Sequence, residues 1–474
     1  MSTQTKRASA SSSSASPSRL RLPVAFSQAA PAAEKHSASS GSHLSNSPER
    51  SRNRIMDHRM EDTPAAEGRK RKPAPSATTT LRDLHDDMLE RVLARLPPAS
   101  YFRLRAVCRR WRAAAASPTF LDACARVPSR DPWFLMLSDA DPDPGVTVAF
   151  DAAERGWNAC RAAPGSVPVA ASGGLVLYRA PATGALTVAN TLTGASRALP
   201  SPPSPQQQHH LQAIAMYGPP YRVALFSGEL PDLSMAVFDS CTNSWEGPVP
   251  LARMPDASCP GAPGQGAGAG GDDTVYFLSK SGDVVATNMQ RSASKQYSSV
   301  VVPSSPARGC GGAGAGKDDD GAVVAYFLSH SGTVVACDTA RRAFAELPRI
   351  LPVYFEYSID VVACGGAAYA VVLSEYLDTA SLRVWGFDAG AWRQVAAMPP
   401  AMSHGFHGKR ADINCVGHGD RLMVCVSSAE ANGCFMCDVA TNSWEELPKY
   451  VNGDGEANEF LAAFSFEPRV EITV

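Results

Sequence analysis

The sequence predicts a multi-domain protein in which a small all-α module, residues 81–125, precedes a large all-β repeat domain, residues 130–468. Two patterns support this division. Apolar residues recur at helical spacing between residues 81 and 121, and apolar runs ending in Asp or Asn recur between residues 150 and 438. Residues 1–80 are rich in Ser, Ala and Pro without either pattern, so we expect them to be disordered because they bury too little apolar surface to offset ordering entropy. Residues 469–474 are expected to form a short C-terminal tail.

The first helix of the module is expected to begin at Asp86 and Asp87, because acidic side chains are favourable near the positive end of a helix dipole. Five apolar residues then recur on one face of a 3.6-residue period: Met88, Leu89, Val92, Leu93 and Leu96. Pro97 and Pro98 are expected to end this helix, since proline lacks the backbone donor and restricts its predecessor.

A second helix is expected after Ser100, whose side chain suits a helix cap. Its apolar stripe follows the spacing i, i+3, i+4 and i+7, at Leu104, Val107, Cys108 and Trp111. Ser117-Pro118 is expected to break it, and a third short helix should begin near Phe120. Three such helices are too small to bury a full core alone. The module is therefore expected to dock on another surface, either in this chain or in a partner.

This module resembles the F-box, by which substrate receptors attach to the Skp1 adaptor of cullin-RING ubiquitin ligases. The resemblance rests on residues 84–97 (LHDDMLERVLARLP), on R-x-R-x-V-C-R-x-W at 103–111 and on S-P-x-F at 117–120. His85 replaces the first proline of the usual pattern, which is expected to loosen one adaptor contact. The resemblance implies nine positions that face Skp1 or hold the helices together: Leu84, Leu89, Leu93, Leu96, Pro97, Leu104, Val107, Cys108 and Trp111.

Beyond about residue 130, short runs of Val, Leu, Tyr, Phe and Cys alternate with turn residues, which is typical of strands. Each unit joins an Asp or Asn to an aromatic residue about six positions later. The copies are Asp151 to Trp157, Asp239 to Trp245, Asp338 to Phe344, Asp438 to Trp444 and, shorter, Asp388 to Trp392, with weaker versions at Asn190 and Asn288. The Asp or Asn is predicted to close a turn by accepting from backbone N–H groups. The aromatic side chain is predicted to pack between neighbouring units.

These units predict a β-propeller, because the anchors from Asn190 onwards are about 50 residues apart, the period of kelch repeats. Residues 276–286 (YFLSKSGDVVA) recur nearly unchanged as 326–336 (YFLSHSGTVVA), an internal duplication one blade long. We predict seven blades, with six as the alternative because the unit around Asn190 is degenerate. Residues 460–466 (FLAAFSF) are expected to close the ring with the first blade.

An F-box followed by degenerate kelch blades resembles a plant group that includes the proteins called Hawaiian skirt and Unusual floral organs. The kelch part of this resemblance includes the paired glycines 173–174 and 365–366. It implies a non-catalytic substrate-recognition subunit of an SCF ubiquitin ligase. The implied partners are a Skp1-like adaptor, cullin 1 through that adaptor, and an unidentified target protein. The alternatives are a non-degradative adaptor or transcriptional co-regulator and, less favoured, a propeller enzyme of the copper oxidase type.

Composition argues against several other classes of protein. The net charge is −2, and no apolar run is long enough to cross a membrane, so neither direct nucleic-acid binding nor a membrane partner is expected. Scattered cysteines suit a reducing compartment, and the basic cluster at 69–72 suits nuclear import, so nucleus, cytoplasm or both are expected. No cofactor or metal site is expected, because the CxxC of Cys434 and Cys437 lacks the second pair that zinc requires.

Overall fold

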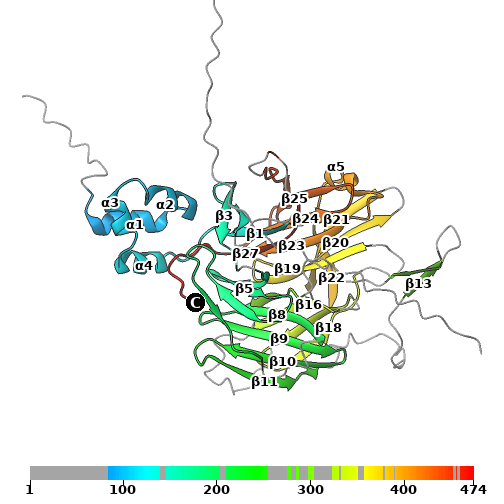
Figure 1. The fold of residues 1–474 in the computed structure, drawn as a ribbon. Coiled ribbons are helices and arrows are strands. Elements are labelled where there is room, and N and C mark those ends of the chain that lie inside the picture. The colour runs from blue at the N-terminus through cyan, green and yellow to red at the C-terminus, as the bar shows by residue number, and fades with distance from the viewer. Residues whose placement is uncertain are drawn as a thin grey trace, which may run out of the picture.

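The computed structural model shows a cluster of short helices beside a ring of β-sheets (Figure 1). It describes residues 84–474 with gaps at 139–145, 162, 164, 203–209, 255–274, 279–283, 288–296, 304–322, 330–331, 351–356, 377–378, 389, 452–454 and 456–458. The expectations for residues 1–80 and for the basic cluster at 69–72 lie outside the described residues. None of the described helices is long and apolar enough to span a membrane.

The helical module contains four helices rather than the predicted three. They are α1 (Asp86–Arg95), α2 (Pro98–Leu104), α3 (Arg109–Ala114) and α4 (Pro118–Ala125). The predicted second helix is interrupted because Cys108 adopts an extended conformation and caps α3, its Sγ accepting from the Trp111 N–H at 3.5 Å. Ser100 is not a cap, since α2 begins at Pro98, where a missing backbone donor carries no cost. Ser117 does cap α4 and accepts from the Phe120 N–H at 3.0 Å.

Six sheets, each built around a four-stranded antiparallel meander, form the ring, so the propeller has six blades. Blade 1 comprises β27 (Phe460–Phe466), β1 (Trp133–Ser138), β2 (Val146–Asp151) and β3 (Gly156–Arg161). Blade 2 comprises β4 (Val167–Ser172), β5 (Leu175–Arg179), β6 (Leu186–Ala189) and β7 (Ser196–Ala198). Blade 3 comprises β8 (Leu211–Tyr217), β9 (Arg222–Glu229), β10 (Asp232–Asp239) and β11 (Ser244–Pro250).

The other three blades repeat this order. Blade 4 comprises β15 (Val300–Pro303), β16 (Val323–Leu328), β17 (Val334–Asp338) and β18 (Ala343–Glu346), extended by β12 (Ala252–Arg253). Blade 5 comprises β19 (Tyr357–Cys364), β20 (Ala367–Tyr376), β21 (Thr379–Asp388) and β22 (Ala391–Ala397). Blade 6 comprises β23 (Asp412–His418), β24 (Arg421–Ser427), β25 (Asn432–Asp438) and β26 (Ser443–Glu446), and it follows a short helix α5 (Pro400–Ser403) and a 3-10 turn (His404–Phe406).

Of the two predicted blade counts, the alternative of six is confirmed and the favoured seven is wrong, because one copy of the duplication stays outside the ring. Strands β13 (Val275–Leu278) and β14 (Val284–Thr287) pair with each other and with no other strand that the structure describes, and they lie away from the blades (Figure 1). Their register, with Leu278 opposite Val284, is that of Leu328 opposite Val334 in blade 4. The unit around Asn190, which the sequence marks as degenerate, instead forms the complete blade 2.

The ring closes as predicted. The C-terminal β27 pairs antiparallel with β1, with Trp133 opposite Phe466 and Ser138 opposite Phe460. Blade 1 is thus assembled from both ends of the repeat domain, and closure protects the strand edges of the two terminal blades.

The Asp or Asn side chain and the aromatic side chain of the repeated units act as predicted. In five units the Asp or Asn side chain accepts from backbone N–H groups two or three residues later: Asp151, Asn190, Asp239, Asp338 and Asp438. The aromatic residues pack into apolar clusters shared by adjacent blades. Trp157 packs between blades 6 and 1, Trp245 between blades 2 and 3, and Trp444 between blades 5 and 6.

Candidate protein-interaction site

The helical module has its own small apolar core. Leu89 and Leu93 of α1 are 0% and 1% exposed and pack against Phe120 and Cys124 of α4. Tyr101 of α2 stacks on Phe120 with ring centroids 5.2 Å apart. Burial raises the pKa of the Cys124 thiol to about 11, which keeps it protonated and inert at neutral pH. Leu89 and Leu93 therefore hold the helices together, one of the two roles that the resemblance implies, and contact with an adaptor at these positions stays a prediction.

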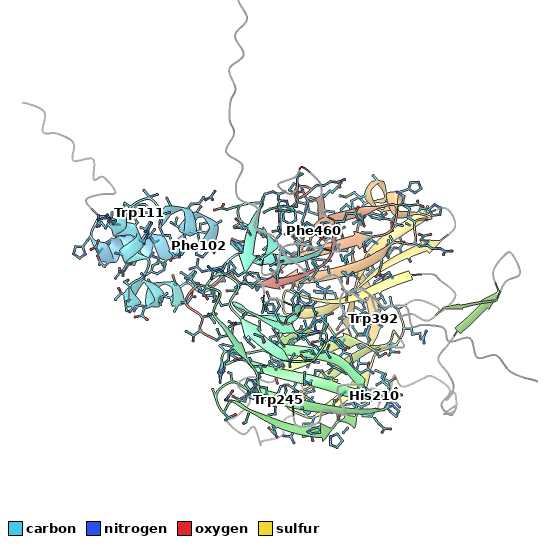
Figure 2. All side chains as sticks on the ribbon, viewed as in Figure 1. Phe102, Trp111, His210, Trp245, Trp392 and Phe460 are labelled. Carbon is cyan, nitrogen blue, oxygen red and sulfur yellow. The ribbon has the colours of Figure 1, made fainter. Side chains whose placement is uncertain are left out.

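The remaining predicted positions lie nearer the surface. Leu84, Leu96, Pro97, Leu104 and Trp111 are half-buried around the core. Val107 and Cys108, between α2 and α3, are exposed, Val107 to 68%. Figure 2 shows Trp111 on the helical module, well apart from the propeller. No contact with an adaptor is present to test these positions, so their binding role stays a prediction.

Exposed apolar side chains that the motif does not single out lie on α1 and α4. Met88 and Val92 are 47% and 42% exposed, although the helical period places them on the same broad apolar face as the buried Leu89 and Leu93. Leu121 of α4 is also exposed. The packing of α4 divides the stripe on α1 into a core half and a surface half. The width of that stripe is a signal in the sequence for a second, solvent-facing use of α1.

Polar contacts fix the start of α1 and its neighbour α3. The His85 Nδ1 and Asp87 Oδ1 atoms are 2.6 Å apart, and this hydrogen bond is the main cause of a lowered pKa at Asp87. The Arg110 guanidinium donates to Asp86 at 2.8 Å, which ties α3 to α1. His85, where the usual pattern has proline, thus contributes to the N-terminus of the helix.

The module is joined to blade 1 by a small polar interface. The Ser100 hydroxyl donates to Glu154 at 2.6 Å, and Arg103 pairs with the same carboxylate. The hydrogen bond from Ser100 is the main reason that the pKa of Glu154 lies below its usual range, and the pairing with Arg103 adds to it. Arg130, in the linker, donates to the carbonyls of Leu96 and Ala94 at 3.2 and 2.7 Å. The helices are therefore tethered both by their own side chains and by the chain that leaves them.

The C-terminal residues reinforce this joint. Residues 467–474, here called the C-terminal strap, were expected to end in a simple tail from residue 469. Instead Arg469 donates to the linker carbonyls of Val127 and Pro128 at 3.1 and 3.0 Å. Asn190 of blade 2 donates to the carbonyls of Arg469 and Ile472 at 2.9 and 3.0 Å. Val470 packs against the helical core, so the strap contacts helices, linker and propeller together.

The helical module lies at one face of the propeller. In blade 1, Trp133 is opposite both Asp151 and Phe466. The turn that holds Glu154 and the end of β27 therefore lie on the same face of the propeller. The strap continues along this face, where the Glu467 N–H donates to the Gly173 carbonyl at 2.7 Å. The start of β27 lies at the other face, about 20 Å away for seven residues of strand. The hairpin between β24 and β25 lies on that far side, since Arg421, at its opposite end, donates to Ala152.

The cysteine side chains of the CxxC motif, which the sequence offers as possible metal ligands, do not come together. Cys437 is buried, while the Cys434 Sγ lies 3.8 Å from the Sγ of Cys425 on the adjacent strand. Among the described residues, no group of three or more His, Cys, Asp or Glu side chains is arranged to hold a metal ion.

Comparison with known proteins agrees with this architecture. Residues 81–122 match the F-box domain family. The chain is 41% identical over 411 residues to F-box only protein 13 of Arabidopsis thaliana, covering 83% of this chain and 85% of that protein. It is 30% identical over 176 residues to Protein ABERRANT PANICLE ORGANIZATION 1 of Oryza sativa subsp. indica, covering 33% and 41%. Similarity to the solved structure of TolB from Acinetobacter baumannii, at a TM-score of 0.37 and 9% identity over 75% and 72% of the chains, carries no functional information.

A four-helix module on a closed six-bladed propeller, with exposed apolar side chains on the helices, defines a protein-interaction scaffold. The chain belongs to the F-box protein family, as its F-box and its similarity to F-box only protein 13 over most of both chains show.

Proposed function

We propose that this protein is the substrate-recognition subunit of an SCF ubiquitin ligase, with its helices bound to a Skp1-like adaptor and its propeller bound to a target protein. The observation that carries the proposal is the exposure of Met88, Val92 and Val107 on a module whose core is already filled. Several exposed apolar side chains on such a small module favour a protein partner. In the ligase, the protein holds the target's lysines near the charged E2 enzyme and so raises the effective concentration of those lysines there.

Charge on the module supports the same kind of partner. Arg105, Arg109 and Arg112 are exposed around the turn between α2 and α3, next to Val107 in the sequence. Exposed basic side chains on the module complement an acidic partner and speed its association.

A binding experiment with a recombinant Skp1-like adaptor tests this role. We expect the full chain to capture the adaptor and the Met88→Asp/Val107→Asp double variant to lose at least about tenfold in affinity, because a charge enters a desolvated contact. Val395→Asp is the matched control, since Val395 is 44% exposed but lies on the propeller. Equal affinity of all three proteins would refute the proposal. Leu93→Asp is unsuitable here, because it would unfold the module rather than test its surface.

The finer assignments are part of the same proposal. The kelch character of the blades and the link to the plant Hawaiian skirt group rest on the repeat period and paired glycines. Action in the nucleus, the cytoplasm or both rests on the basic cluster at 69–72, and live-cell imaging of a variant with these four residues changed to alanine tests it.

Target capture is tested by proximity labelling with residues 84–125 deleted, which should retain targets that the intact chain sends to degradation.

A further inference from the structure

A pocket of about 370 Å³ opens between blades 6 and 1. One wall is aromatic: the ring of Trp157 lies 5.1 Å from that of Phe460 and 5.7 Å from that of Tyr450, measured between centroids. Three carboxylates, from Glu430, Glu446 and Glu459, complete much of the lining. The pocket therefore combines π faces with negative charge.

These carboxylates are not neutralised by described neighbours. Glu430, Glu446 and Glu459 are exposed, and none forms an ion pair with a cation among the residues that the structure describes. Lys449 is the one basic residue in the lining, so three negative charges face one positive charge. By contrast the neighbouring Glu445 is held by Arg155 at 2.8 Å. The pocket is left with a net negative potential that favours a cationic ligand.

The position of the pocket suits a target. Glu430 lies in the hairpin between β24 and β25, and Glu459 immediately precedes β27. Both lie on one face of the propeller. Glu154 and the C-terminal strap hold the helices on the opposite face. Phe460 lies within the propeller, apart from Phe102 and Trp111 of the helical module (Figure 2). A ligand in the pocket would leave the adaptor-binding surface free.

We propose that this pocket binds an arginine side chain of the target protein. A planar guanidinium stacks on aromatic rings and pairs with carboxylates in the same site, and it is less strongly hydrated than an ammonium group, so its desolvation costs less. The pocket then supplies one specificity element of recognition, a basic residue in an exposed segment of the target. This inference rests on the proposed function of the propeller in target binding, but it is tested separately from adaptor binding.

The test is an NMR titration of the full chain labelled with ¹⁵N in its seven tryptophan indoles. The probe is Nα-acetyl-arginine N-methylamide, and its neutral near-isostere Nα-acetyl-citrulline N-methylamide is the matched control. Trp157→Phe assigns the Trp157 signal. We expect saturable shifts of this signal with the arginine probe and none with citrulline.

Charge variants complete the test. We expect Glu430→Gln/Glu459→Gln to weaken arginine binding by about tenfold, because charge-assisted contacts become neutral, while Asp388→Asn, a substitution on another blade, leaves it unchanged. Absent shifts, equal shifts with citrulline, or stronger binding of the corresponding lysine derivative would each overturn the proposal. Adaptor capture by the Glu430→Gln/Glu459→Gln variant should remain normal, which separates this test from that of the proposed function.

Discussion

The Nε1 atom of Trp392 donates a hydrogen bond of 2.6 Å to the carbonyl oxygen of Pro348. Trp392 is the second residue of β22, the outer strand of blade 5, and Pro348 follows β18, the outer strand of blade 4. Trp245 makes the same contact with Pro200 at 2.8 Å, from blade 3 to blade 2. Two of the repeated tryptophans, Trp245 and Trp392, thus each join their blade to the preceding one through a proline carbonyl, whereas Trp444 donates to Asn442 of its own blade. Both tryptophans lie on the propeller in Figure 2.

Replacing Trp392 with phenylalanine should destabilise the propeller by about 1 kcal/mol, the net value of a typical hydrogen bond. The aromatic contact with Phe387, at 5.1 Å between centroids, should persist. Urea denaturation followed by circular dichroism measures the change. Trp385→Phe in the same blade is the control, since its Nε1 is buried without a hydrogen-bond partner among the described residues. A loss as large for Trp385→Phe would show that indole size, not the hydrogen bond, matters.

Leu93→Ala should destabilise the helical module by roughly 2–5 kcal/mol, because it leaves a cavity beside Phe120. Val92→Ala, one position away but 42% exposed, should cost under about 0.5 kcal/mol. Hydrogen exchange of the amides of α1 and α4 measures both. Similar exchange in the two variants would contradict the division of the α1 stripe into core and surface.

The contact between Glu154 and the pair Ser100 and Arg103 should make docking of the helices depend on pH. The folded-state pKa of Glu154 is lowered, so its contribution is present above the usual glutamate value of about 4.3 and is lost as pH falls through the lower folded value. The wild type should therefore exceed Glu154→Gln in thermal stability at pH 7, and the two should converge near pH 3. A constant difference across this range would show that the lowered pKa does not contribute.

Arg469→Ala should loosen the joint between helices and propeller. The guanidinium bonds Glu467 at 2.7 Å, Glu471 at 3.0 Å and two linker carbonyls, and its loss leaves the buried Glu471 carboxylate uncompensated. We expect a cost on the order of 2 kcal/mol, less than for a fully buried pair.

Exchange of the amides in residues 126–131 measures the effect of Arg469→Ala. Arg393→Ala is its control, because that exposed arginine only approaches Asp388 at 3.6 Å. Unchanged exchange in Arg469→Ala would show that the strap does not hold the linker.

Local sequence determined much of this protein. The helical period predicts the apolar stripe that includes Leu89 and Leu93, and the Asp-to-aromatic spacing predicts both the turns at Asp151 and Asp438 and the packing of Trp157. The pairing of β27 with β1 was also predictable, because an apolar strand at the C-terminus must find an edge. The turns and the stripe depend on contacts within a few residues or on simple periodicity, and the β27–β1 pairing follows from an apolar strand that needs a partner.

Tertiary structure alone decided the rest. The segments beginning at Tyr276 and Tyr326 form the same hairpin, yet only the second joins a blade, because membership requires flanking strands and a place in a closed ring. Which half of the α1 stripe is buried depends on where α4 packs, and the strap of Arg469 depends on carbonyls more than 340 residues away. Such long-range contacts have no local pattern, since the groups that satisfy them come from backbone positions that the sequence does not mark.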